Sequence, residues 1–354
     1  MLSDNNNDIK DLLKSYLITD EKEYIELLSK VEKVTLDNVG DKVYFRGLIE
    51  LSNYCVKDCY YCGIRKGNTE AHRYELSVSD VLSAIDVAYE QNYGSIVIQA
   101  GERTDIQFVD KISEIIIEAK SRYKDHLGIT LSLGEQSKET LQKWFDYGAH
   151  RYLLRIETSN RELYYKWHPN NALHDYDNRL STLYSLKEIG YQVGTGVLIG
   201  APFQSVDDLV NDLVFYKTFD IDMVGMGPFI SHPNTPLFDK KETSDDLKHR
   251  FDLSLRMITS LRLLMPTINI AAATSLQAID PMGREKAVRA GANIIMPNVT
   301  PQKSRADYQL YPNKPCIDEE AWECKGCLEA RLSMVHRDIG FGEYGDSPHF
   351  FERI

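Results

Sequence analysis

The chain has 354 residues, of which 43% are hydrophobic and 27% are charged, a composition typical of a globular protein with a large core. Asp and Glu number 53 against 41 Lys and Arg, and the formal charge of -12 does not favour a nucleic-acid-binding surface. No run of eighteen or more apolar residues occurs, and the polar start lacks the features of a secretory signal. We therefore expect a cytoplasmic protein that binds neither nucleic acid nor membrane.

The first 40 residues predict two short helices. Apolar residues recur at helical spacing from Ile9 to about Val34, and the pattern breaks near Thr19 and Asp20. Asp20 is a suitable N-cap for the second helix, because its side chain can accept hydrogen bonds from the first backbone N–H groups. We expect residues 1–40 to form a helical lid over one end of the domain.

Residues 41–300 alternate short β-rich runs with helical patterns. Several helical patterns end in a glycine just before the next run, as αβ loops with a C-terminal glycine cap do. Eight expected strands in this alternation predict an α/β protein, a (β/α)8 TIM-type barrel, and no Gly-x-Gly-x-x-Gly stands where an open dinucleotide-binding sheet would carry it. The expected strands are Val43–Leu51, Ser95–Gln99, Gly128–Leu133, Arg151–Ile156, Val193–Ile199, Met223–Gly227, Ile268–Ala273 and Ile294–Met296.

Residues 301–354 break the alternation and are rich in Pro, Tyr and charge. This C-terminal extension carries three of the six cysteines, and the other three lie together after the first expected strand. The partition points to metal rather than to disulfides, and to a reducing, low-oxygen compartment. We expect the extension to pack across the barrel rather than to form a separate domain.

The strongest chemical signal is the loop Cys55-x3-Cys59-x2-Cys62. Three thiolates at this spacing can hold one iron–sulfur cluster and leave one iron without a protein ligand. A zinc knuckle would need a fourth ligand, and the next histidine is His72, ten residues past Cys62. The spacing, with Tyr61 before the third cysteine, resembles the signature of the radical S-adenosylmethionine (SAM) superfamily. The resemblance implies a [4Fe–4S] cluster whose open iron chelates SAM and whose electron cleaves SAM to a 5′-deoxyadenosyl radical.

Polar residues at the carboxyl ends of the other expected strands are candidate site residues, because chemistry in α/β barrels gathers there. After the second strand comes Gly101-Glu102, where a glycine lets the backbone approach a ligand closely. Arg155 and Glu157 share a face of their strand and form either part of the site or a buried structural ion pair. Arg179 is either a carboxylate-binding guanidinium or a solvated arginine at a helix start.

The C-terminal extension carries a second cysteine group, Cys316-x7-Cys324-x2-Cys327, again without a fourth thiolate. It predicts either a second iron–sulfur cluster with an open or water-ligated iron, or a zinc site completed by another residue. We favour the cluster.

A closer resemblance runs along nearly the whole chain. Its stretches are Cys55–Arg65, Thr130–Glu135, Arg151–Thr158, Asp222–Ile230, Gly291–Asn298, Tyr308–Pro312 and the second cysteine group. Together they resemble the HydE family, the radical SAM maturases of [FeFe]-hydrogenase. The methylornithine synthases and biotin synthases are related families.

The resemblance implies a role for each matching residue. Cys55, Cys59 and Cys62 would hold the cluster, and Arg155 and Glu157 would take part in catalysis. SAM would be bound by Tyr61, Gly101, Glu102, Ser132, Glu157 and Arg179. The substrate cavity would be lined by Gln99, Thr130, Arg155, Met226, Thr274, Met296, Tyr308 and Tyr311. The second cluster, on Cys316, Cys324 and Cys327, would not be needed for the chemistry.

The function that the resemblance implies is hydrogenase H-cluster maturation. The adenosyl radical would attack the sulfur of an iron–cysteine carbonyl/cyanide precursor of the diiron subcluster. The implied partners are an electron donor such as flavodoxin or ferredoxin and the other hydrogenase maturases. Two positions depart from the pattern of some family members, Ile156 and Arg103, and we expect both near the barrel mouth, where they bear on the access of ligands.

Three alternatives remain open. A methylornithine-synthase-like amino-acid mutase would have a similar barrel, but that family lacks the second cysteine group. Biotin-synthase-like sulfur insertion would need cluster ligands inside the barrel, and no cysteine lies on the second to eighth expected strands. A non-catalytic iron–sulfur scaffold or carrier would bind a cluster without cleaving SAM, and it would need no enclosed cavity.

Overall fold

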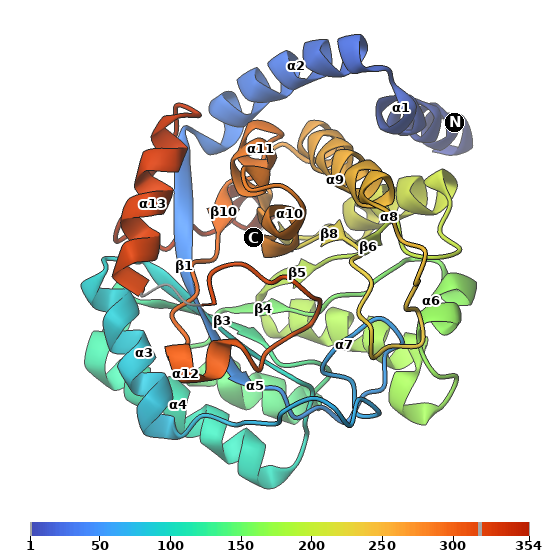
Figure 1. The fold of residues 1–354 in the computed structure, drawn as a ribbon. Coiled ribbons are helices and arrows are strands. Elements are labelled where there is room, and N and C mark those ends of the chain that lie inside the picture. The colour runs from blue at the N-terminus through green and yellow to red at the C-terminus, as the bar shows by residue number, and fades with distance from the viewer. Residues whose placement is uncertain (1, 318–320, 354) are drawn as a thin grey trace.

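The computed structural model describes residues 2–317 and 321–353, which form a barrel of parallel strands surrounded by helices (Figure 1). The strands follow one another around the barrel in the order β10, β1, β2, β3, β4, β5, β7, β9. A parallel bridge between Ala271 and Ile294 joins β9 to β10 and closes the ring. The predicted (β/α)8 architecture is confirmed. The ring strands are β1 (Lys42–Ser52), β2 (Ser95–Ala100), β3 (Gly128–Ser132), β4 (Arg151–Leu153), β5 (Gln192–Thr195), β7 (Met223–Val224), β9 (Asn269–Ile270) and β10 (Ile294–Ile295).

Several helices between the strands begin at well-formed caps. Ser77, Ser205 and Thr243 each form a capping box with an aspartate three residues later, which satisfies N–H groups that the helix itself leaves unpaired. No helix in the described part of the chain is long and apolar enough to span a membrane. The helices after β1 are α3 (Val78–Glu90), α4 (Ile106–Tyr123), α5 (Lys138–Asp146), α6 (Arg161–Trp167), α7 (Tyr176–Ile189), α8 (Val206–Phe219), α9 (Ser244–Leu264), α10 (Thr274–Ile279), α11 (Gly283–Arg289), α12 (Gln302–Arg305), α13 (Ala321–Ser333) and α14 (Pro348–Arg353).

Two of the predicted strands are interrupted. The expected strand Val193–Ile199 is divided into β5 and β6 (Leu198–Ile199), and the expected strand Met223–Gly227 is divided into β7 and β8 (Gly227–Pro228). β6 and β8 pair with each other as a separate two-stranded sheet. The predicted strands over residues 151–156, 268–273 and 294–296 are likewise shorter in the structure.

The interruption has a physical cause in the side chain of Arg155. Its guanidinium donates hydrogen bonds to the carbonyl oxygens of Val197, at 2.8 Å, and of Gly225. These two backbone groups are thus satisfied by a side chain rather than by a neighbouring strand. The strands therefore open at their carboxyl ends, where a charged residue enters between them.

The N-terminal helices are α1 (Leu2–Ile18) and α2 (Glu21–Val39), and they pack on α8 and α9 outside the ring, along the top of Figure 1. Asp20 caps α2, as the sequence predicts, by accepting a hydrogen bond of 2.9 Å from the backbone N–H of Glu23. Leu13 and Leu17 of α1 are buried in the main hydrophobic core.

The C-terminal extension contacts the amino ends of the barrel strands. β11 (Asp338–Ile339) pairs in parallel with the start of β1. Arg151 donates hydrogen bonds to the carbonyl of Tyr344, at 2.9 Å, and to the carboxylate of Asp346, at 2.6 Å. Arg46 donates to the carbonyl of Gly345 at 3.0 Å. This segment therefore covers the end of the barrel opposite to the site described next.

Candidate active site

A cavity of about 340 Å³ lies at the carboxyl ends of the strands, within the size range of small-molecule sites. Its wall includes the cysteine loop after β1, the ends of most ring strands, and residues 308–316 of the C-terminal extension. The predicted site residues that line it are Cys55, Cys59, Tyr61, Cys62, Gln99, Gly101, Glu102, Ser132, Arg155, Glu157, Arg179, Thr274, Met296, Tyr308, Tyr311 and Cys316.

Two residues predicted to line the cavity do not. Thr130 is buried and its hydroxyl accepts a hydrogen bond of 2.9 Å from Arg151, in the layer toward the opposite end of the barrel. Met226 is fully buried, whereas its neighbours Gly225 and Gly227 line the cavity. Because side chains alternate between faces along extended backbone, Met226 points away from the cavity.

The two positions that depart from the family pattern also lie outside the cavity wall. Ile156 is fully buried in the hydrophobic core. Arg103 forms ion pairs with Glu75, at 2.6 Å, and with Asp105, at 2.8 Å. Neither side chain is among those that line the cavity, so their effect on the access of ligands stays a prediction.

The cysteine loop presents three free thiols to the cavity. The backbone N–H of Glu102 approaches the sulfur of Cys55 at 3.3 Å. A side chain at Gly101 would place its Cβ 2.3 Å from the carbonyl oxygen of Tyr54, so only glycine allows this close approach. The fit of the cysteine loop to β2 thus depends on Gly101.

Burial makes these thiols resist ionisation on their own. It raises the pKa of Cys59 to about 12, with the guanidinium of Arg179 opposing the shift, and raises the pKa of Cys62 well above the ordinary value. Cationic irons would remove this cost, because a metal deprotonates the thiols that bind it. No three His, Cys, Asp or Glu side chains of the described residues are grouped to hold a single metal ion. The three thiols nevertheless all line one cavity, as the ligands of one multinuclear cluster must.

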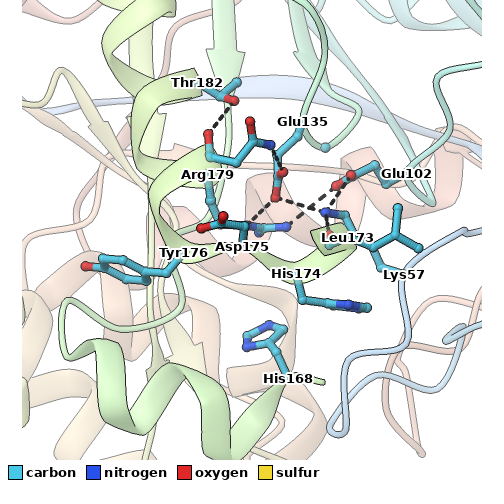
Figure 2. A network of polar contacts seen from close by, with 12 residues as sticks. Lys57, Glu102, Glu135, His168, Leu173, His174, Asp175, Tyr176, Arg179 and Thr182 are labelled. Carbon is cyan, nitrogen blue, oxygen red and sulfur yellow. Dashed lines mark hydrogen bonds and ion pairs between the residues drawn. The ribbon is translucent and has the colours of Figure 1, made fainter. Parts of the chain in front are cut away.

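Next to the thiols lies a network of four buried charges, shown in Figure 2. Lys57 pairs with Glu102 at 3.0 Å and with Glu135 at 3.1 Å. Arg179 donates from Nε to Glu135 at 2.9 Å and lies 3.6 Å from Glu102. Two cations thus face two carboxylates in a nearly solvent-free environment, so each charge depends on the others.

Neither Lys57 nor Glu135 was identified as a site residue from the sequence. Lys57 stands inside the cysteine loop, and Glu135 ends the stretch Thr130–Glu135, so both lay within segments that carry the family resemblance. Spacing does not reveal that two such charges are buried and paired. Arg179 is not the solvated arginine of the alternative interpretation, because it is buried and also donates to the carbonyl of Arg155 at 2.8 Å.

Arg155 and Glu157 form a two-point ion pair. Nε and one terminal nitrogen of Arg155 donate to the two carboxylate oxygens of Glu157, each at 2.9 Å. The backbone of Glu157 has φ of 68°, a left-handed conformation that costs free energy in a residue other than glycine. Both side chains line the cavity, so the pair belongs to its wall.

Tyr61 is held in place by His168, which sequence analysis did not single out. The hydroxyl of Tyr61 lies 3.2 Å from Nε2 of His168, and Nδ1 of His168 lies 2.8 Å from the carbonyl of Tyr164. Nδ1 must donate to that carbonyl, so Nε2 accepts from Tyr61. Burial lowers the pKa of His168 well below its usual value, and this keeps the imidazole neutral.

The part of the cavity wall formed by the C-terminal extension contains a second buried ion pair. Lys314 binds both carboxylate oxygens of Glu50, at 2.5 and 2.6 Å, and Asn298 donates to the same carboxylate at 3.1 Å. The amide nitrogen of Gln99 donates to the hydroxyl of Tyr308 at 3.2 Å. The extension therefore completes the cavity rather than lying outside it.

Known proteins resemble this chain in sequence and fold. Residues 49–215 match the Radical SAM superfamily. The [FeFe] hydrogenase maturase subunit HydE of Thermotoga maritima is 40% identical over 346 residues, which cover 98% of this chain and 95% of that protein. The 3-methylornithine synthase of Methanosarcina acetivorans is 29% identical over 300 residues, which cover 84% and 81%.

Solved structures agree with these matches. The crystal structure of methylornithine synthase (PylB) has a TM-score of 0.77 and 25% identity, covering 95% of this chain and 94% of that one. The [FeFe]-hydrogenase maturase HydG from Carboxydothermus hydrogenoformans has a TM-score of 0.75 and 17% identity, covering 94% and 79%, and shares the fold. The extent and identity of the first match decide the family: this chain belongs to the HydE family of radical SAM enzymes.

Proposed function

We propose that this enzyme acts in the maturation of [FeFe]-hydrogenase. Its substrate would be an iron–cysteine carbonyl/cyanide precursor of the diiron subcluster. The observation that carries this proposal is the 40% identity to a HydE maturase subunit over 98% of the chain. The cavity lined by three free thiols supports it, because a scaffold or carrier needs no such cavity.

The cofactors of the family are a [4Fe–4S] cluster and SAM, and Cys55, Cys59 and Cys62 would hold the cluster. When bound, the cluster and SAM together supply a 5′-deoxyadenosyl radical. Lys57 and Arg179, with their two buried carboxylate partners, keep the adjoining wall polar without leaving a net charge there. Buried groups of this kind can bind the amino and carboxylate ends of an amino acid such as SAM.

Four further residues would complete the SAM site. Gly101 leaves its backbone accessible, and Ser132 adds a hydroxyl to the cavity wall. Tyr61 is fixed by its contact with His168, and Glu157 by its ion pair with Arg155. Because the side chains of Tyr61 and Glu157 are already held by a neighbour, little of their conformational entropy would be lost when SAM binds.

A mutase of the methylornithine synthase type is the second candidate. It is favoured by the TM-score of 0.77 to the methylornithine synthase structure and by 29% identity to 3-methylornithine synthase. The higher identity to HydE, over a larger share of the chain, favours the maturase. Free lysine is the substrate that separates the two.

The decisive experiment measures 5′-deoxyadenosine formed anaerobically by the reduced, cluster-loaded protein. We expect a large rise with a synthetic iron–carbonyl–cyanide–cysteine complex and none with lysine. The variant Cys59→Ala should abolish the rise, since it removes a cluster ligand. A rise with lysine alone would support the mutase, and cluster-loaded protein that never cleaves SAM would leave only the carrier.

The remaining roles are extensions of the same proposal. The enzyme would work in the cytoplasm with an electron donor such as flavodoxin or ferredoxin and with the other hydrogenase maturases. Cys316, Cys324 and Cys327 would hold a second cluster that the chemistry does not need. Cys316 lines the cavity and Cys327 is exposed on α13, whereas the side chain of Cys324 lies outside the described residues.

The second cluster has its own test. Cys327→Ser should lower the iron content of the anaerobically reconstituted protein while SAM cleavage persists. An iron content unchanged from that of the wild type would remove the second cluster from the proposal. Loss of SAM cleavage in a variant that keeps the first cluster would show that the second one is needed.

A further inference from the structure

One buried cation in the cavity wall has no carboxylate partner among the described residues. Arg284 of α11 is only 3% exposed and lines the cavity. Among the described residues no carboxylate lies within ion-pair distance of it, and its buried Nε has no hydrogen-bond partner. Its one hydrogen bond runs from a terminal nitrogen to the sulfur of Cys316, at 3.6 Å.

The other charges of the cavity account for one another. Lys57 and Arg179 face Glu102 and Glu135, Arg155 pairs with Glu157, and Lys314 pairs with Glu50. The carboxylate next to Arg284 in sequence, Glu285, is engaged by Arg331 at 2.7 Å. Within the part of the chain that the structure describes, Arg284 is therefore the cavity cation that no carboxylate balances.

A buried, unpaired guanidinium is costly, because it has lost water without gaining an anion. A folded protein tolerates such an arrangement where a bound ligand supplies the missing negative charge, or where the unpaired group itself has a functional role. The guanidinium fork matches a carboxylate well, since two parallel N–H groups can bind its two oxygens.

We infer that Arg284 binds the carboxylate of an amino-acid moiety in the substrate and thereby selects substrates that carry one. This deepens the proposed function and rests on it, because the precursor named there contains cysteine. Arg284 lines the cavity together with Tyr311 and with Cys316, to whose sulfur it donates. The substrate carboxylate would therefore bind where the C-terminal extension closes the cavity, and Lys314 and Glu50 would stay paired with each other.

The test compares two ligands that differ by one carboxylate. The cluster-loaded full chain is titrated anaerobically with the iron–carbonyl–cyanide complex of cysteine and with that of cysteamine, which keeps the thiol and amine. We expect the wild type to bind the cysteine complex about 10- to 100-fold more tightly, the range of a charged hydrogen-bonded contact. In Arg284→Gln the two dissociation constants should become equal, and Arg284→Lys should retain part of the difference.

Controls separate this role from general effects of charge and folding. Arg289→Gln removes an exposed arginine from the same helix and should preserve the discrimination. The dissociation constant of SAM should be unchanged in Arg284→Gln, because the predicted SAM residues are other side chains. Equal affinity of the wild type for both complexes, or undiminished discrimination in Arg284→Gln, would overturn the inference.

The inference can fail independently of the proposed maturase activity. If both complexes stimulate SAM cleavage equally, the activity stands and the role of Arg284 falls. If neither complex binds, the maturase proposal falls, and the same comparison is made with lysine and its decarboxylated counterpart, cadaverine. Failure to prefer lysine over cadaverine would then reject the carboxylate site as well. If Cys316→Ala and Arg284→Gln each weaken the binding of both complexes by the same factor, Arg284 acts by holding Cys316 in place and not by binding a substrate carboxylate. That result would overturn the inference.

Discussion

At the residue scale, the buried charges of the cavity wall depend on each other for their stability. Lys57→Met would leave Glu102 and Glu135 with Arg179 as their only cationic partner in the network. Burial already raises the pKa of Glu102, and the loss of Lys57 removes one of the charges that oppose the rise. We expect the free energy of unfolding to fall by about 3 kcal/mol, as when one partner of a buried ion pair is removed.

Thermal unfolding of the Lys57→Met variant measures this loss, with SAM affinity as a second readout. The matched control is Lys66→Met, which removes an exposed lysine from the same loop region. Its melting temperature should stay near that of the wild type. Equal effects of the two substitutions would mean that the buried network contributes little to stability.

A second residue-scale prediction concerns Asp212 of α8, which supports the turn after Glu157. The backbone N–H and hydroxyl of Ser159 both donate to one oxygen of Asp212, each at 2.6 Å. Burial raises the pKa of Asp212 to about 7, against the opposing hydrogen bonds from Ser159. The folded protein therefore binds a proton more readily there than the unfolded chain does.

This difference fixes the sign of the pH effect. Between the ordinary aspartate pKa and about 7, the folded state holds more protons, so the contribution of Asp212 to stability falls as pH rises. Asp212→Asn keeps an oxygen acceptor for Ser159 and cannot ionise. We expect the melting temperature of the wild type to fall relative to that of Asp212→Asn as the pH rises from about 5 to about 8. Asp207→Asn, on the exposed side of the same helix, should run parallel to the wild type.

Site residues were predictable from the sequence where spacing or family resemblance marked them. The cysteine loop follows from its spacing alone. Burial and pairing are not visible in a sequence, so Lys57, Glu135 and Arg284 were missed. Thr130 was misplaced for a related reason: strand alternation gives the face of a residue but not its level along the barrel axis.

At the element scale, the opened strands depend on glycine. A Cβ at Gly196, between β5 and β6, would lie 1.9 Å from the carbonyl oxygen of Gly225. That carbonyl accepts from Arg155, so displacing it would disturb the ion pair with Glu157. We expect Gly196→Ala to lower both the melting temperature and the affinity for SAM.

Gly225→Ala is the matched control for this substitution. A Cβ there would be 3.7 Å from the nearest atom of Leu153, an ordinary van der Waals contact. It should fold and bind SAM nearly as the wild type does. If Gly196→Ala behaves like Gly225→Ala, the backbone at the opening is more adaptable than these distances indicate.

The sequence predicted the order and type of the elements better than their lengths. Strand starts follow from apolar runs and the glycines that precede them, and the ring order agrees with the predicted fold. Strand ends in this barrel are decided by tertiary contacts such as that of Arg155 with Val197 and Gly225. Local pattern does not contain this information, which is why residues 193–199 and 223–227 were each predicted as one strand.

At the scale of the whole molecule, the C-terminal extension joins the two ends of the barrel. Tyr308 and Lys314 contribute to the cavity wall, whereas Asp346 binds Arg151 at the opposite end. Burial would raise the pKa of Asp346, but its hydrogen bond from His150 and the charge of Arg151 outweigh this and lower the pKa well below the ordinary value. The extension is thus anchored at the far end by an interaction that strengthens the folded state above acidic pH.

The N-terminal helices give the contrasting case and the last prediction. None of the described residues of α1 or α2 lines the cavity, and α1 packs on the outer helices α8 and α9. A chain that begins at Asp20 loses the burial of Leu13 and Leu17, worth about 1.5–3 kcal/mol for each leucine, but keeps the cap of α2. Its melting temperature should therefore fall while its dissociation constant for SAM stays that of the full chain.

A chain that ends at Arg337 loses β11 and Asp346, so its melting temperature should fall further. If the extension helps to hold the cavity wall, this chain should also bind SAM more weakly. Weakened SAM binding in the chain that begins at Asp20, measured at a temperature where that chain is still folded, would show that α1 supports the site through the outer helices.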